Sequence, residues 1–166
     1  MKRTADDEIL VEMGMYEVAE APLTLVSLGL GSCVGVAIYD AGKKTGGLAH
    51  VMLPEIDDDH SKDAQNPNKY ANLAVPAMVK DLEQKGCDVK NLRAKIAGGA
   101  HMFPTLSKEQ TLDIGRRNVE SVSAILKSLG ISLRAERTGG SVGRTVRFDL
   151  STGMFSIKTK EGVEEI

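Results

Sequence analysis

The order of strand-like and helix-like segments constrains the fold of this chain more than any other feature. Short apolar runs come first and are joined by short turns; they cover residues 9–16, 23–28, 34–39 and 47–53, and Gly14 interrupts the first of them. A helix, a strand, a second helix and three further strands follow. This order lacks the regular strand–helix alternation of a doubly wound parallel sheet. It predicts an α+β fold, a layered sandwich of mixed or antiparallel β-sheet with two main helices on one side.

Two segments have the spacing of amphipathic helices. Residues 70–85 have apolar side chains three to four positions apart, and Pro76 indicates either a start near residue 75 or a kink. Residues 114–129 carry a continuous apolar stripe, and Asp113 can cap their start. Both segments are followed by glycine, which commonly ends a helix.

The rest of the chain is predicted as strands, turns and one long loop. Residues 29–32 form a tight turn of small residues, residues 55–68 are a polar loop bracketed by proline, and residues 160–166 are a charged, frayed tail. A single domain covers residues 1–166. The remaining strands are expected at residues 92–97, 131–137, 145–149 and 154–158.

Composition excludes several classes of function. The net charge is −2, with 21 basic and 23 acidic residues, so the chain lacks the basic surface that binds nucleic acid. Aromatic residues make up 4% and tryptophan is absent, which argues against base stacking. The chain begins without the apolar core of a signal peptide and contains no apolar stretch of membrane-spanning length. We therefore expect a cytoplasmic protein without membrane insertion, whose two cysteines are free thiols.

Cys33 stands between a glycine-rich turn and an apolar strand, in the segment SLGLGSCVGVAIYD. Small residues let a substrate carbonyl approach closely, so we expect Gly31 and Ser32 to help bind the substrate and its oxyanion. Backbone N–H groups released by the turn can stabilise an oxyanion, as acyl transfer requires. A buried, unreactive cysteine fits this segment at least as well when it is considered alone.

The position of His50 favours a catalytic role for Cys33. It lies in GGLAHVMLP, on the strand expected to form a hairpin with the strand that begins after Cys33. In such a hairpin the start of one strand lies near the end of the other, so the thiol and the imidazole come close. An imidazole beside a thiol can accept its proton and activate it as a nucleophile.

The other cysteine and histidines offer weaker candidates. His101 follows a glycine pair and is a rival base that no spacing places near Cys33, and Cys87 has no histidine near it in sequence. His60 follows an acidic run, which indicates a hydrated loop, because no second ligand cluster accompanies it. We predict no metal site and no cofactor.

Several motifs together resemble the CheD family of chemoreceptor glutamine deamidases over nearly the whole chain. They occur in the family's order and are separated along the sequence. The motifs are LGLGSCVGVAIYD (28–40), GGLAHVMLP (46–54), KYANLAV (69–75), AKIAGGAHMF (94–103), IGRRNVE (114–120) and TGG…GRTVRFDLSTG (138–153).

The resemblance implies a catalytic constellation and partners. Cys33 falls on the family's nucleophile and His50 on its histidine, while Ser27 stands where the family has a threonine; Thr24 is a second hydroxyl on the same segment. The fold should resemble that of bacterial toxin-type cysteine deamidases. The implied substrates are glutamines, and also glutamyl methyl esters, on the cytoplasmic helices of chemoreceptors. The implied partner is a CheC-type phosphatase, which leaves a regulatory binding module as the alternative to an enzyme.

Overall fold

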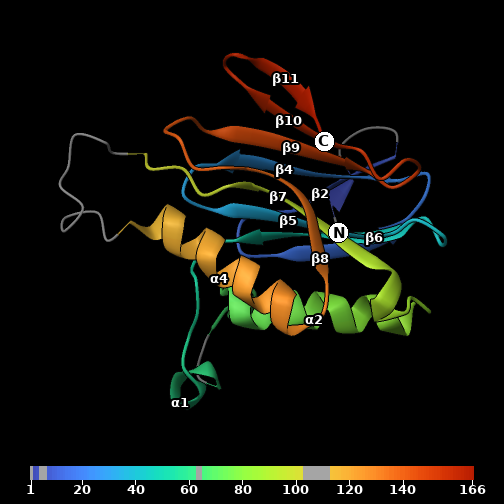
Figure 1. Ribbon diagram of the computed structural model, residues 1–166, viewed down its shortest axis with the longest axis horizontal. Coiled ribbons are helices and arrows are strands. Elements are labelled where there is room, and N and C mark those ends of the chain that lie inside the picture. The colour runs from blue at the N-terminus through green and yellow to red at the C-terminus, as the bar shows by residue number, and fades with distance from the viewer. Residues whose placement is uncertain (1, 4–6, 63–64, 103–112) are drawn as a thin grey trace.

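The computed structural model describes residues 2–3, 7–62, 65–102 and 113–166. The elements form three layers: a six-stranded sheet, a five-stranded sheet, and two helices on the outer face of the five-stranded sheet (Figure 1). Figure 1 shows the six-stranded sheet at the top and the helices at the bottom. The predicted α+β sandwich, with both main helices on one side, is confirmed.

The six-stranded sheet, called sheet A below, is mixed. Its strands have the order β1-β2-β4-β9-β10-β11. The β2–β4 pair is parallel, and the other neighbouring pairs are antiparallel. Its strands are β1 (Lys2–Arg3), β2 (Glu8–Leu10), β4 (Thr24–Leu30), β9 (Arg144–Asp149), β10 (Phe155–Thr159) and β11 (Gly162–Glu165).

The five-stranded sheet, called sheet B below, has the order β3-β6-β5-β7-β8. Only its β7–β8 pair is parallel. The central β5–β6 pair is the hairpin predicted around residues 41–44. Its strands are β3 (Tyr16–Glu20), β5 (Val34–Asp40), β6 (Thr45–Val51), β7 (Leu92–Gly98) and β8 (Ser132–Thr138).

Two apolar cores lie on the two faces of sheet B. On one face, β5, β6 and β7 pack against the helices; Met78, Leu82 and Val122 are fully buried there. On the other face the sheet packs against sheet A around Leu48, Phe148 and other fully buried side chains. The helical elements are α1 (Asp58–Ser61), η1 (Pro67–Lys69), α2 (Ala71–Gln84), η2 (Val89–Asn91) and α4 (Ile114–Ser128).

Two predicted strand boundaries were wrong. The strand expected over residues 9–16 is two strands in different sheets, β2 and β3, because Gly14 adopts a positive φ of 71° and the chain crosses between the layers there. The expected turn at residues 29–32 is shifted, because β4 continues to Leu30. A bulge between Ser27 and Leu30 accommodates Gly29, which has a φ of 68°.

The prediction of a frayed tail at residues 160–166 was also wrong. Residues 162–165 form β11, which pairs antiparallel with β10. The backbone of Ile166 exchanges two hydrogen bonds with Phe155, and Ile166 packs against the inter-sheet core. The charged side chains there mark an exposed edge strand rather than a disordered end.

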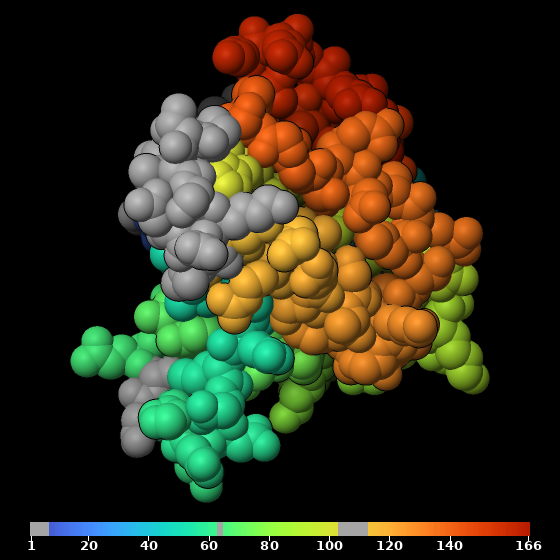
Figure 2. Space-filling model, turned by 60° about the vertical axis from the view of Figure 1, so that its left-hand side comes forward, coloured from blue at the N-terminus to red at the C-terminus, as the bar shows by residue number. Residues whose placement is uncertain are grey.

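Both main helices occupy their predicted ranges, and the structure decides two open points about their starts. Helix α2 begins at Ala71, well before Pro76, which lies inside the helix. Asp113 does not cap α4 with its side chain; it adopts a left-handed conformation and pairs with Arg116 at 2.9 Å. In the polar segment after Pro54, the described residues include the short helix α1, which projects below α4 in Figure 2. None of the helices in the described ranges is both long and apolar enough to span a membrane.

Candidate active site

Cys33 and His50 lie on the same face of sheet B. Gly35 is the register partner of His50 across the β5–β6 ladder, and Cys33 comes two residues before Gly35. Side chains two positions apart point to the same face of a strand, so Cys33 is a diagonal neighbour of His50. Val34 packs toward the helices, whereas Cys33 packs against the core between the two sheets. Gly35 contributes no side chain between the thiol and the imidazole.

Ser27 reaches His50 from the other sheet. It is fully buried on β4, and its Oγ lies 2.7 Å from His50 Nδ1. The same hydroxyl donates its single hydrogen to the carbonyl of Val11 at 2.9 Å. The Ser27 oxygen must then accept from His50, which places the imidazole proton on Nδ1. The hydrogen bonds therefore select the tautomer in which Nε2 carries a free lone pair.

The environment of His50 keeps its ring neutral. The side chain is 1% exposed, and burial lowers its pKa to about 4. Its Nε2 atom is buried and, within the described part of the chain, has no hydrogen-bond partner. A buried neutral nitrogen with an unused lone pair can accept a proton from a nearby thiol.

Hydrogen bonds to three carbonyl groups fix the backbone of the turn from Gly31 to Cys33. The Gly31 carbonyl accepts from the N–H of Ala100 at 2.9 Å, and the Cys33 carbonyl accepts from the N–H of Gly99 at 2.8 Å. The Ser32 carbonyl accepts from the side-chain amide of Asn118 at 2.9 Å. In a trans peptide the N–H points away from the carbonyl. The N–H groups of Ser32 and Cys33 are consequently turned away from these anchoring bonds.

The thiol of Cys33 is partly buried and protonated at rest. Burial raises its pKa, and the N–H of Cys33 itself, which faces the sulfur, opposes that rise. No hydrogen bond joins the sulfur to His50 among the residues that the structure describes. The site as the structure shows it thus holds a neutral thiol and a neutral imidazole. Catalytic hydrogen bonds are often long before substrate binds.

The structure separates the two hydroxyl candidates. Ser27 contacts His50, whereas Thr24 lies three positions earlier on β4, so its side chain points to the other face of sheet A. Of the two residues expected to help hold an oxyanion, Ser32 contributes the peptide that precedes Cys33. Gly31 lies against the side chain of Met102. A Cβ atom added at Gly31 would lie 3.0 Å from Met102 Cγ, so a larger residue there would have to displace the Met102 side chain.

His101 lies closer to the turn than its sequence position indicated. A cavity of about 170 Å³ is lined by Ser32, His101, Met102, Asp113 and others at the start of α4. His101 Nδ1 is 4.0 Å from a carboxyl oxygen of Asp113. The cavity thus has both apolar and polar side chains in its lining next to Ser32. His60, by contrast, is exposed and its ring hydrogen-bonds to the carboxyl group of Asp57.

Asn118 is the residue at the site that sequence reasoning missed. It is fully buried on α4, and its side-chain amide donates to the carbonyls of both Ser32 and Met52. One sequence signal could have revealed it: Asn118 occupies a position of the apolar stripe four residues before Val122. A polar side chain on the buried face of a helix must find hydrogen-bond partners.

A thiol, a neutral imidazole acceptor and directed backbone N–H groups are the components that a cysteine acyl-transfer enzyme uses. The comparisons with known proteins agree with that class. The family described as "CheD chemotactic sensory transduction" matches residues 52–159, a segment that begins two residues after His50. The chain belongs to the CheD family.

Full-length relatives support the same assignment. A Clostridium kluyveri protein is 46% identical over 96% of this chain and 98% of its own length. A Clostridium novyi protein is 45% identical over 92% of this chain and 93% of its own. Each carries the name "Probable chemoreceptor glutamine deamidase CheD". A solved structure, the hypothetical protein YfiH of Bacillus licheniformis, aligns with a TM-score of 0.46 and 17% identity over 74% of this chain and 49% of that chain, too weakly to define fold or function.

Proposed function

We propose that this chain hydrolyses the side-chain amide of glutamine residues in chemoreceptors, producing glutamate and ammonia. The names of relatives that are more than 40% identical over nearly the full chain supply the substrate class. The observation that carries the chemistry is the Ser27–His50 hydrogen bond, which leaves His50 Nε2 as a free base on the face that also holds Cys33.

The proposed reaction has two halves, each with a tetrahedral intermediate. Cys33 gives its proton to His50 Nε2 while its sulfur attacks the carboxamide carbon, and the N–H groups of Ser32 and Cys33 bind the oxyanion. The C–N bond breaks, and His50 returns the proton to the departing ammonia. His50 then takes a proton from water, which attacks the thioester. The C–S bond breaks, glutamate leaves, and the thiol is restored; none of these steps requires a metal or an organic cofactor.

Ser27 is proposed to orient His50 through both halves of the reaction. Its hydroxyl is anchored on the Val11 carbonyl, so it holds the Nδ1–H and keeps Nε2 available. A serine performs this task through its oxygen alone, although it lacks the methyl group that restricts the rotamers of threonine. When His50 becomes protonated in the transition state, the Ser27 oxygen still accepts from it.

The proposed substrates are glutamines, or glutamyl methyl esters, on the surface of receptor helices. Leu28 and Met102, which are 53% and 41% exposed, flank the turn and provide apolar contacts for such a helix. The proposal places the protein in the cytoplasm, where the receptor's signalling helices lie. The end of the molecule at which α4 begins, and which carries this turn, comes forward in Figure 2.

A CheC-type phosphatase is the proposed second partner, at the same surface. The exposed apolar side chains beside the turn suit a helix of either protein. Cys33→Ala removes a sulfur and leaves that surface nearly unchanged, so the variant should retain CheC or a receptor fragment in a pull-down yet convert no glutamine. If the native protein retained CheC and never deamidated a receptor of its own organism, the regulatory binding module would become the better account.

Mass spectrometry of a receptor cytoplasmic fragment tests the enzymatic proposal. The fragment is incubated with the native protein and with Cys33→Ala. Native protein should increase the mass of defined glutamine-containing peptides by the amide-to-acid difference, and Cys33→Ala should leave them unchanged. An unchanged fragment in both samples would reject the proposal for that receptor, and equal conversion in both would reject Cys33 as nucleophile.

A further inference from the structure

Asn118 joins the two segments that carry the thiol and the imidazole. Its amide nitrogen donates to the Ser32 carbonyl at 2.9 Å and to the Met52 carbonyl at 3.0 Å. Ser32 immediately precedes Cys33, and Met52 comes two residues after His50. The β5–β6 ladder ends at the pair Val34–Val51. Asn118, on a helix at the outer face of sheet B, thus connects the segment before β5 to the segment after β6, just beyond the last paired residues of the two strands.

The bond to Ser32 determines the direction of one particular N–H group. The Ser32 carbonyl and the Cys33 N–H belong to one planar trans peptide, so they point in opposite directions. Asn118 holds the carbonyl on the helix side of the turn. The N–H of Cys33 must then face the opposite side, where it lies against the Cys33 sulfur. Rotation of this peptide would require the Ser32 carbonyl to leave Asn118.

The neighbouring peptides are fixed by a different means. Ala100 and Gly99 hold the Gly31 and Cys33 carbonyls with backbone N–H groups, which any residue except proline supplies. Only the central peptide depends on a side chain. Asn118 uses both hydrogens of its amide on the two carbonyls, and its Oδ1 is buried with no hydrogen-bond partner in the described ranges. An amide that leaves a buried acceptor unmatched is poorly suited to stability alone.

We propose that Asn118 is a positioning residue that aims the Cys33 N–H at the oxyanion. This proposal rests on the deamidase function for its physiological reaction, but its geometry applies to any acyl transfer to Cys33. Asn118 touches neither the thiol nor the substrate in this account. It acts through the Ser32–Cys33 peptide, so it should affect reactions that form an oxyanion and spare reactions of the same sulfur that do not.

Two reagents make that distinction without a receptor. p-Nitrophenyl acetate acetylates the thiol: the sulfur bonds to the carbonyl carbon, an oxyanion forms, and p-nitrophenolate leaves. Iodoacetamide alkylates the thiol by direct displacement of iodide, and no oxyanion forms. The rates at Cys33 are measured with both reagents in a Cys87→Ala background, which leaves Cys33 as the single cysteine of the chain. The variants are Asn118→Leu and Asn118→Asp, which keep the approximate size of the side chain and lose its donors.

Asn72 provides the matched control. It lies on the other main helix, α2, and also clamps a loop: its amide donates to the Ile56 carbonyl at 2.8 Å and accepts from the Ile56 N–H at 3.0 Å. Asn72→Leu therefore removes a comparable helix-to-loop clamp that does not involve the Cys33 turn. It should leave both rates at Cys33 near those of the native protein.

The Asn118 variants should lower the acetylation rate by up to roughly 10²–10³-fold, the effect of losing one oxyanion donor. The alkylation rate should stay within about threefold, because the thiolate fraction and the exposure of the sulfur control it. With receptor fragment, kcat should fall while KM stays nearly constant, as for an interaction made only in the transition state.

Equal loss of both rates would overturn the proposal, because Asn118 would then act on the thiol or on the whole fold. Native acetylation in a folded Asn118→Leu protein would also overturn it. If neither variant unfolded cooperatively, Asn118 would be a residue of general stability and the specific role would be rejected. Failure of the deamidase function has a separate signature: native protein would acetylate Cys33 in an Asn118-dependent manner yet convert no receptor glutamine.

Discussion

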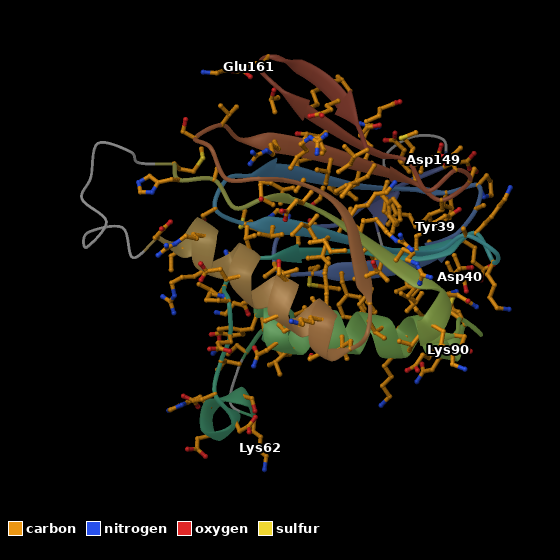
Figure 3. All side chains as sticks on the ribbon, in the orientation of Figure 1. Tyr39, Asp40, Lys62, Lys90, Asp149 and Glu161 are labelled. Carbon is orange, nitrogen blue, oxygen red and sulfur yellow. The ribbon has the colours of Figure 1, made fainter. Side chains whose placement is uncertain are left out.

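The two ends of strand β5 each have a cysteine nearby, in contrasting surroundings. Cys33 precedes the strand and packs against the core between the two sheets, with His50 on the same face of sheet B. Cys87 lies near the other end, where Asp40 closes the strand, and it packs into the helix-side core. In Figure 3 the labelled Tyr39, Asp40 and Asp149 gather at this second end, away from the start of α4.

Burial raises the pKa of both thiols, so the pKa does not distinguish the two ends. At the Cys87 end the negative charge of Asp40 raises the pKa further. At the Cys33 end the N–H of Cys33 opposes the rise, and a neutral imidazole with a free Nε2 lies on the same face. On the proposed function, the reactivity of Cys33 comes from the groups arranged around its sulfur rather than from the burial that both thiols share.

The largest difference in activity between the two ends is expected when each sulfur is removed in turn. Cys33→Ala and Cys33→Ser should abolish deamidation of a receptor fragment, because alanine has no nucleophile and the hydroxyl of serine is far weaker than a thiol beside a neutral imidazole. Cys87→Ala should retain the native rate. Turnover by mass spectrometry and folding by circular dichroism are measured on the same samples. A Cys87→Ala protein that is folded and inactive would show that the second end takes part in catalysis.

Removing the base should have the next largest effect. His50→Ala should lower kcat by roughly 10²–10⁴-fold, the usual contribution of a general base. It should also slow alkylation of Cys33 and leave that of Cys87 unchanged, since the charged groups that act on Cys87 are Asp40, Lys43 and Glu20 and do not include His50. Peptide mapping after partial alkylation gives both rates from one sample. Unchanged labelling of Cys33 in His50→Ala would mean that the imidazole does not act on the thiol.

Replacing the hydroxyl behind the base should cost less than removing the base itself. Ser27→Ala removes the acceptor for His50 Nδ1 and the donor to the Val11 carbonyl, so kcat should fall by less than in His50→Ala. Ser27→Thr keeps the oxygen and should retain or increase activity. Thr24→Ala, three residues along the same strand, is the matched control and should be near native. Full activity of Ser27→Ala together with an inactive Thr24→Ala would transfer the orienting role to Thr24.

The burial of His50 predicts a pH-dependent stability. Its pKa is about 4 in the folded protein against an ordinary value of 6.5, so below pH 6.5 the unfolded chain binds the proton first. The free energy of unfolding should fall as pH drops from 6.5 to 4, by about 3 kcal/mol in total for this one group. Urea titrations of native protein and His50→Gln should show that fall as a difference between them. A native slope in His50→Gln would contradict the buried neutral ring.

The site could be predicted from sequence wherever neighbours along the chain determine it. The short β5–β6 hairpin makes Cys33 and His50 neighbours once residues 41–44 are recognised as a turn, and the prediction needed nothing from the rest of the fold. The contact between Ser27 and His50 depends on how sheet A packs on sheet B. Sequence left Thr24 as an alternative because no local pattern encodes that packing.

Contacts between segments that lie far apart in the sequence could not be predicted, for the same reason. Asn118 meets Ser32 and Met52 across separations of 86 and 66 residues. The tail at residues 160–166 looks disordered by composition, but its backbone finds an unpaired sheet edge on β10. A charged edge strand and a frayed end have similar side chains, and only the pairing partner distinguishes them.

Titration of activity against alkylation tests the central claim most directly. Native protein is treated with increasing iodoacetamide, and the modified fractions of Cys33 and Cys87 are measured by peptide mapping beside the rate of receptor deamidation. Cys33 should be labelled much faster than Cys87, and the remaining activity should equal the unmodified fraction of Cys33 and reach zero when that fraction does. Activity that persists with Cys33 fully alkylated, or that follows the labelling of Cys87, would contradict the assignment of Cys33 as the nucleophile.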